Sequence, residues 1–282
     1  MSTRATVEID GLSVSYQRSG YGPALVLLHG FLSDSRAWTP QLQSLSDQFT
    51  VIAWDAPGAG LSSDPPETFG IGEWADCLSA FLGAVDVERA HVIGLSWGGI
   101  LAQEFYRRHF AQVRSLVLAD TYAGWKGSLP DPIPQERLAG CLADASLPPD
   151  AVVSKYLPGM FTESASQDVR EETASIMSEF HPAGFRLMAK ASAETDTREL
   201  LPSIEVPTLL IWGDADARSP ITVAHQLHNA IPGARLAIIP GAGTSATSNN
   251  PDSLIQRSAT SVFREPSRRD LSLSSPAGTV KQ

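Results

Sequence analysis

The chain has 282 residues, of which 43% are hydrophobic and 18% are charged, so it is long enough to bury a large core. Its formal net charge of -10 argues against a nucleic-acid binder, because such proteins present basic surfaces to phosphates. No basic amphipathic stretch indicates a membrane surface, and no apolar run has the length of a membrane-spanning helix. We therefore expect a globular protein whose partner is a small-molecule substrate.

Two features of the sequence indicate the cellular compartment of the protein. Cys77 and Cys141 are the only cysteines, too few for a disulfide framework or a four-cysteine zinc site, and we expect both to be buried as small apolar side chains. The first ten residues, MSTRATVEID, lack the apolar segment of a secretory signal. These features predict a cytoplasmic protein.

The first predicted elements form a hairpin, with strands Thr6–Ile9 and Leu12–Arg18 joined by Asp10-Gly11. Further along, continuous apolar runs typical of strands buried on both faces recur at Ala24–Leu28, Val51–Trp54, His91–Leu95, Val113–Leu118, Thr208–Trp212 and Arg235–Ile239. Helical patterns alternate with them, at Ile71–Val85, Gly98–His109, Ile221–Ala230 and Ser253–Phe263. This alternation predicts an α/β protein with a mostly parallel, doubly wound sheet.

The alternation stops between residues 121 and 195, where prolines gather and helical pieces such as Gln167–Phe180 and Phe185–Ala193 replace strands. A segment of this length is too long for a simple loop and predicts an inserted helical lid. We expect the lid to cover the carboxyl ends of the strands, where open α/β sheets bind ligands. Its aromatic residues Trp125, Phe161 and Phe180 are candidates for substrate binding.

The predicted domain organisation is a core made of residues 1–120 and 196–265, with the lid at 121–195 between its two parts. Residues 266–282 are rich in serine, proline and charge without periodicity, which predicts a disordered tail.

The clearest chemical motif is the run Gly94-Leu95-Ser96-Trp97-Gly98-Gly99. It lies between a predicted strand and a predicted helix, which is the context of a nucleophile elbow. Flanking glycines allow a sharp turn that exposes the Ser96 hydroxyl. The first backbone N–H groups of the following helix lie where an oxyanion could form. Ser96 is the predicted nucleophile.

At this motif the chain resembles the α/β-hydrolase family, and the resemblance extends over residues 5–264. His29-Gly30-Phe31 looks like the family's oxyanion loop, which implies that the backbone N–H groups of Phe31 and Trp97 form the oxyanion hole. The run Asp55–Ser62 is similar to the glycine-rich turn after the next strand. The implied fold is the α/β-hydrolase fold with a helical lid.

The resemblance also implies a catalytic acid, which would hold a histidine in the correct tautomer. Gly213-Asp214-Ala215-Asp216 matches the turn that carries this acid, and Asp216 stands at the matching position. Asp214 in the same turn is one rival, and Asp120 after Val113–Leu118 is another.

The chain departs from the family pattern at the histidine. Pro240-Gly241-Ala242-Gly243 approaches the expected position, but Thr244 follows where the family has histidine. A threonine hydroxyl takes no proton near pH 7 and cannot serve as the general base. The histidines that could substitute for it are His29, His91, His109, His181, His225 and His228.

Thr244 has two explanations, a natural change that removed hydrolysis or an engineered substitution in a working enzyme. The resemblance implies a serine hydrolase of a small, largely apolar carboxylic ester or lactone, acting through an acyl-enzyme. This chain would then be inactive or weak. Alternatives are a carbon–carbon bond hydrolase, a haloperoxidase-like enzyme or a ligand-binding protein without turnover. No metal-site or dinucleotide motif is present, so we expect no metal or cofactor; the oligomeric state stays open.

Overall fold

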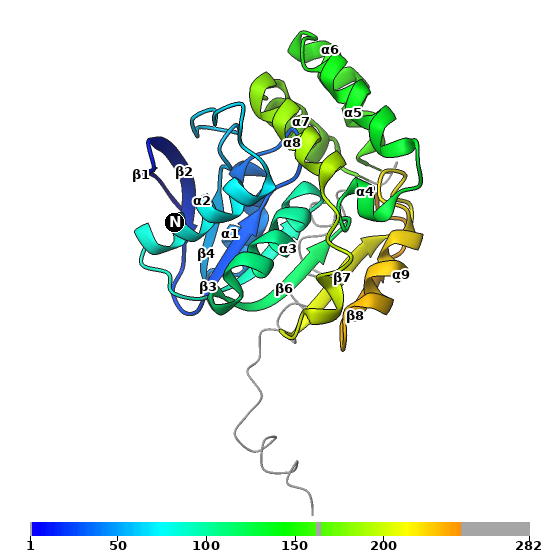
Figure 1. Cartoon of the computed structure of the whole chain (residues 1–282). Helices are drawn as coiled ribbons and strands as arrows, with labels where there is room; N and C mark the ends of the chain where they lie inside the picture. The colour runs from blue at the N-terminus through cyan, green and yellow to red at the C-terminus, as the bar shows by residue number, and fades with distance from the viewer. Residues whose placement is uncertain (1, 162–164, 244–282) are drawn as a thin grey trace, which may run out of the picture.

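The computed structural model describes residues 2–161 and 165–243 (Figure 1). Its centre is an eight-stranded sheet in the order β1-β2-β4-β3-β5-β6-β7-β8. The strands are β1 (Thr3–Ile9), β2 (Leu12–Ser19), β3 (Ala24–Leu28), β4 (Thr50–Trp54), β5 (Ala90–Leu95), β6 (Val113–Ala119), β7 (Thr208–Gly213) and β8 (Arg235–Ile239). β1 and β2 form the predicted antiparallel hairpin and β2 also pairs antiparallel with β4, whereas the remaining pairs are parallel.

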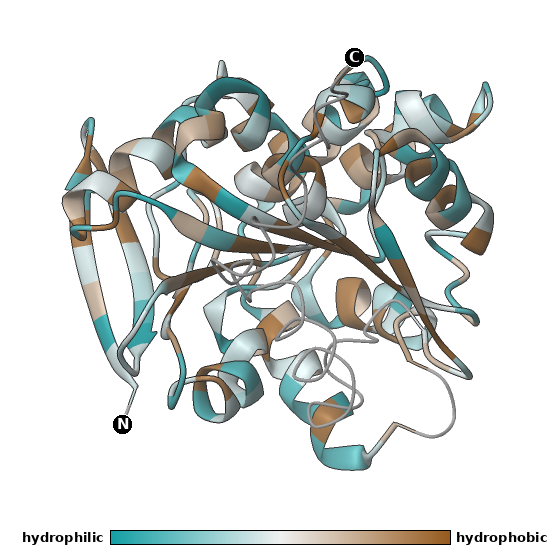
Figure 2. Cartoon of the chain, turned by 90° about the horizontal axis from the view of Figure 1, so that it is seen from below, coloured by the Kyte–Doolittle hydropathy of each residue, from teal (hydrophilic) through white to brown (hydrophobic). Residues whose placement is uncertain are grey.

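Helices cover both faces of this sheet, as Figure 2 shows around the brown central strands. Outside the segment between β6 and β7 they are α1 (Thr39–Ser44), α2 (Ile71–Ala84), α3 (Trp97–His109) and α9 (Ile221–Ala230), with short 3-10 turns at Ser35–Trp38 and Phe110–Gln112. A further 3-10 turn at Leu201–Ser203 lies just before β7. Buried residues of α2, α3 and α9 belong to one apolar cluster, and those of α1 belong to a second.

Strand β3 shows why the central strands are continuous apolar runs. Val26 and Leu28 lie in the cluster with α2 and α3, whereas Leu25 and Leu27 lie in the cluster with α1. Successive side chains of a strand point to opposite faces, so a sheet covered on both sides needs an apolar residue at every position.

Between β6 and β7 the chain forms helices rather than strands. They are α4 (Trp125–Ser128), α5 (Ile133–Asp144), α6 (Pro149–Tyr156), a 3-10 turn at Leu157–Gly159, α7 (Gln167–Ser178) and α8 (Pro182–Glu194). Figure 1 shows α5 to α8 grouped on one side of the sheet. Helix α8 meets the core so closely that a Cβ on Gly184 would lie 1.9 Å from the carbonyl oxygen of Gly58. We call the segment from α4 to α8 the helical lid.

The predicted fold class is confirmed, and the helical patterns at 71–85, 98–109 and 221–230 correspond to α2, α3 and α9. The predicted helix Ser253–Phe263 and the predicted tail 266–282 lie outside the described residues. Across the described ranges, each helix is too short or too polar to cross a bilayer.

The packing of α3 on β3 yields a stability prediction. A Cβ on Gly98 would lie 2.2 Å from the carbonyl oxygen of Leu28, so Gly98→Ala must push α3 away from the sheet. We expect a loss of about 1–3 kcal/mol in the free energy of unfolding, measured by chemical denaturation.

Gly83→Ala is the matched control, because Gly83 lies in α2 and a methyl group added there would meet no heavy atom within 4 Å. That change is expected to stabilise the protein by about 0.5–1 kcal/mol through helix propensity. Equal effects of the two substitutions would contradict the close contact at Gly98.

Candidate active site

Ser96 lies in a strained turn between β5 and α3. Its backbone has φ 53° and ψ -114°, a left-handed conformation that non-glycine residues rarely adopt. The surroundings hold it there, because its N–H donates to the carbonyl of Ala119 at 2.9 Å and its carbonyl accepts from the Thr121 hydroxyl. Such strain persists only where neighbouring structure fixes it, and it gathers at functional sites.

The loop after β3 lies against Ser96. A Cβ on Gly30 would be 3.3 Å from the Cβ of Ser96, so a side chain at this position would force Ser96 or the loop to shift by a few tenths of an ångström. Phe31 follows, and Trp97 begins α3, where the first backbone N–H groups have no acceptor within the helix. Phe31 and Trp97 line the same cavity as Ser96. Their amides remain our predicted oxyanion donors.

His29 is fully buried at the base of this loop. Its Nε2 accepts a hydrogen bond from the N–H of Ala56 at 3.0 Å, so the ring proton is on Nδ1, which donates to the carbonyl of Gly30 at 2.8 Å. Burial lowers the pKa of His29, and the bond to Gly30 opposes this shift only in part. Both ring nitrogens are therefore engaged, one by the loop after β3 and the other by the turn after β4, and His29 is not available as a base for Ser96.

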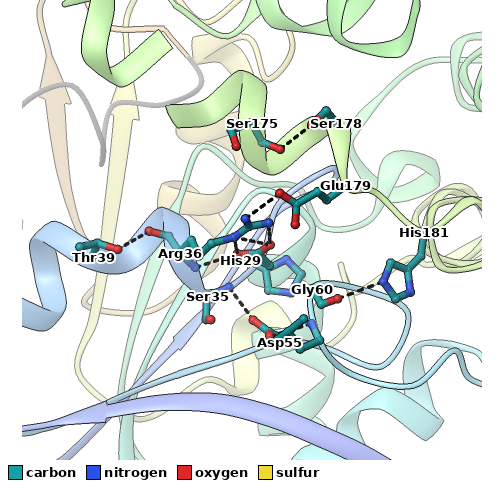
Figure 3. A network of polar contacts seen from close by, with 12 residues as sticks. His29, Ser35, Arg36, Thr39, Asp55, Gly60, Ser175, Ser178, Glu179 and His181 are labelled. Carbon is teal, nitrogen blue, oxygen red and sulfur yellow. Dashed lines mark hydrogen bonds and ion pairs between the residues drawn. The ribbon is translucent and has the colours of Figure 1, made fainter. Parts of the chain in front are cut away.

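Polar contacts fasten the rest of the loop to the core and to the lid (Figure 3). Asp55 accepts from the N–H of Ser35 at 2.8 Å. The Arg36 guanidinium pairs with Asp34 at 2.7 Å and with Glu179, just after lid helix α7, at 3.0 Å. The loop that borders Ser96 is thus fixed on two sides.

The three candidate acids have different surroundings. Asp216 is buried, and its Oδ1 accepts from the N–H groups of Arg218 and Ser219 at 2.7 and 3.0 Å. Asp214 is exposed and accepts from the N–H of Gly241 at 2.6 Å. Asp120 is fully buried and accepts from the N–H of Gly213 at 2.9 Å. Asp214 is directed to a surface turn, which leaves Asp216 as the preferred candidate and Asp120 as its rival.

The chain after β8 returns to the turn at residues 213–216, which carries two of the candidate acids and is called the acid turn below. There the N–H of Ala215 donates to the carbonyl of Ala242 at 3.0 Å. Gly243 comes next and is packed beside Met160. Thr244, the predicted position of the missing base, lies outside the described residues.

All six histidines of the chain fall within the described residues, and none of them lines the cavity of Ser96. His181 contacts Asp64 at 2.6 Å and the carbonyl of Gly60 at 3.0 Å through its two ring nitrogens. His109 pairs with Asp76, and His91 contacts Ser115 inside the sheet, where burial lowers its pKa to about 4. His225 and His228 lie on α9, away from the cavity.

Ser96 opens onto a cavity of about 370 Å³ between the sheet and the lid. Its wall consists of Phe31, Ser96, Trp97, Ile100, Tyr122, Trp125, Arg137, Gly140, Cys141, Asp144, Lys155, Tyr156, Ser192, Ala217 and Arg218. Trp125 of the lid lies on this wall, and its ring centre is 5.7 Å from that of Phe31. Its role in substrate binding stays a prediction.

Phe161 and Phe180 do not line this cavity, and we withdraw them as substrate-binding candidates. Phe161 packs under the guanidinium of Arg170 at 5.5 Å. Phe180 packs on Phe185 at 5.8 Å and borders a separate, much smaller hollow. The sequence identified aromatic residues in the predicted lid as candidates for substrate binding, but it could not show which of their rings face the cavity.

The sequence reasoning missed the charged part of the wall, namely Arg137, Lys155 and Arg218. One signal was present in α5, where the neighbours of Arg137 at three and four positions along the helix are Ile133, Pro134, Gly140 and Cys141. A cation without a helical ion-pair partner on such a face indicates a special environment. Arg218 had a weaker signal, its place two residues after Asp216.

The mostly parallel sheet covered by helices and the strained turn at Ser96 together point to one class of proteins. The family model described as alpha/beta hydrolase fold matches residues 23–251, and the chain belongs to that family.

Similar proteins come from several bacteria. The chain is 30% identical over 231 residues to the pimeloyl-(acyl-carrier protein) methyl ester esterase of Vibrio cholerae, covering 78% of this chain and 87% of that protein. It is 27% identical over 217 residues to 3-oxoadipate enol-lactonase 1 of Acinetobacter baylyi, covering 75% and 78%. A malate-bound structure of a thermophilic esterase from Thermogutta terrifontis superposes with a TM-score of 0.80 at 26% identity, covering 88% and 94%.

The environment of His29 predicts a neutral ring with its proton on Nδ1. In long-range nitrogen–proton NMR spectra, His29 should keep this tautomer as the pH falls from about 8 to 6. The folded pKa lies below the value of about 6.5 in an unfolded chain. The stability that neutral His29 contributes is therefore complete above that value and decreases at lower pH. Titration of the folded His29 ring near pH 6.5 would contradict this assignment.

Proposed function

We propose that this chain has the site of a serine hydrolase for a small carboxylic ester or lactone, with turnover impaired because Thr244 replaces the histidine base. Ser96 would attack the substrate carbonyl, and the N–H groups of Phe31 and Trp97 would stabilise the oxyanion of the tetrahedral intermediate. The alcohol part would leave, and water would then break down the acyl-enzyme.

One observation carries this proposal: Ser96 stands at φ 53° on the wall of a cavity beneath the lid, beside two candidate amide donors. A turn held in a costly conformation is retained where the exposed side chain serves a purpose. The esterase and enol-lactonase names of similar proteins support the choice of ester or lactone. The preference for these substrates over amides rests on that similarity.

The impairment follows from proton transfer. Ser96 must lose its proton to attack, and the cavity contains no histidine within the part of the chain that the structure describes. In serine proteases the loss of the histidine lowers turnover by a factor on the order of 10⁶, which corresponds to about 8 kcal/mol. An oxyanion hole cannot offset this, since one donor contributes about 3–4 kcal/mol.

The same lack of a base favours a second candidate function, ligand binding without turnover. The elbow and the cavity would then be inherited from a hydrolase and used only for recognition. The two candidates differ in whether a restored histidine brings back hydrolysis.

Thr244→His is expected to raise the hydrolysis of p-nitrophenyl acetate and butyrate by about 10³-fold or more, because it supplies the missing general base. Steady-state rates of this variant and of the unchanged chain test the expectation. Thr244→Gln is the control, since the glutamine side chain is polar and comparable in size to histidine but takes no proton.

Adding Ser96→Ala to Thr244→His should remove the gain. Fast hydrolysis by the unchanged chain that survives Ser96→Ala would contradict the mechanism. Ligand binding without turnover in both the unchanged chain and the Thr244→His variant would support the binding function instead.

In the Thr244→His background, Asp216→Asn should lower kcat by about 10⁴-fold, because the amide no longer orients and stabilises the imidazolium. Asp214→Asn is the matched control on the same turn and should change kcat little. A large loss of kcat with Asp120→Asn and a small loss with Asp216→Asn would transfer the role of acid to Asp120.

A further inference from the structure

The wall of the Ser96 cavity is positively charged although the protein is acidic. Three cations line it, Arg137, Lys155 and Arg218, against one carboxylate, Asp144. The whole chain carries a formal charge of -10. A cavity whose sign opposes that of the protein concentrates ligands of the opposite charge.

One of these cations is neutralised within the wall. The Lys155 ammonium pairs with Asp144 at 2.6 Å, and the Tyr156 hydroxyl donates to the same carboxylate at 2.7 Å. The charge that remains in the cavity therefore belongs to the two guanidinium groups.

The Arg137 guanidinium is held by neutral groups. It donates to the Tyr122 hydroxyl and to the carbonyl of Arg218, both at 3.0 Å. It also lies near the rings of Tyr122 and Trp125, at 5.7 and 5.8 Å from their centres. These contacts fix its orientation while leaving N–H donors and the full charge available.

Arg218 is held in a similar way from the other side. Its guanidinium donates to the carbonyl of Tyr156 at 2.8 Å and lies 5.2 Å from the centre of that ring. Its Nε is buried and has no acceptor among the described residues. Asp216 is nearby, but its hydrogen bonds to this residue go to the backbone N–H. Burial lowers the pKa of Arg218, and the charge of Asp216 opposes this shift only in part.

Removing guanidinium groups from water is costly where their side-chain hydrogen bonds go to neutral groups, and a bound anion would offset that cost. The planar fork of an arginine matches the two oxygens of a carboxylate. Ser96 and both guanidinium groups line one cavity, and Arg218 also borders a second hollow of about 70 Å³ that contains Ser96. One small molecule can thus reach the serine and the arginines together.

We infer that the cavity takes an ester or lactone that bears a free carboxylate, which Arg137 and Arg218 bind while the reacting carbonyl lies at Ser96. This inference rests on the proposed function and refines its substrate class. It replaces the largely apolar substrate expected from the sequence. The rings of Phe31, Trp125 and Tyr156 would contact the carbon chain between the carboxylate and the ester.

A binding experiment tests the inference on the unchanged chain, whose slow turnover leaves ligands intact. The probes are monomethyl glutarate, which has one carboxylate and one ester, and dimethyl glutarate, which is neutral and of nearly the same size. Isothermal titration calorimetry is expected to give at least tenfold tighter binding of the monoester, and that preference should weaken as salt is added.

Arg137→Gln and Arg218→Gln should each weaken monoester binding about tenfold or more and leave diester binding nearly unchanged. Arg198→Gln is the matched control, because it also removes one positive charge, here an exposed guanidinium that pairs with Asp196. This substitution should leave monoester binding unchanged. Melting curves establish that each variant is folded. Arg137→Lys and Arg218→Lys keep the charge without the fork and should restore only part of the binding.

Equal binding of monoester and diester would overturn the inference, as would unchanged monoester binding in both folded glutamine variants. Tighter binding of inorganic phosphate than of the monoester would also overturn it, because the arginines would then serve a phosphoryl group. Failure of the hydrolase proposal is a separate result, an absence of Ser96-dependent turnover after Thr244→His, and leaves the binding data unaffected.

Discussion

The site depends on one close contact, the backbone of α3 lying directly on the ends of β3 and β5. A Cβ on Gly98 would lie 2.2 Å from the carbonyl oxygen of Leu28, so the backbones of α3 and β3 lie close together, and Ser96 alone connects the end of β5 to the start of α3. Ser96 must then adopt its left-handed conformation to turn the chain. The strain is offset by the packing of α3 and by hydrogen bonds to the Ser96 backbone. The hydroxyl and the first amide of α3 consequently share one rigid frame.

The lid completes what the core begins. Phe31 belongs to the core loop, yet its ring packs edge-to-face on Trp125 and Phe185 of the lid, at 5.7 and 6.0 Å. Arg36 adds an ion pair from the same loop to Glu179. The cavity is therefore built from two parts of the chain that are distant in sequence, and a shift of the lid would also disturb the loop that carries a proposed oxyanion donor.

The electrostatics of the cavity differ from those of the molecule. Aromatic rings and backbone carbonyls hold Arg137 and Arg218 in place, so their orientation does not require a carboxylate from the protein. Neutral contacts of this kind preorganise a guanidinium for an external anion, whereas an internal salt bridge would compete with it. Lys155 illustrates the contrast, since its ion pair with Asp144 makes it part of the wall.

The sequence by itself determined the layered fold and the place of Ser96 between a strand and a helix. Apolar periodicity and glycine spacing are local signals, and β3, β5 and α3 follow them closely. Only the tertiary structure decided which side chains meet. It separated Phe161 and Phe180 from the cavity, engaged both nitrogens of His29 and brought Arg137 of α5 beside Arg218 of the acid turn. The reason is that the direction of a side chain between distant segments depends on how helices pack on the sheet, which no local pattern records.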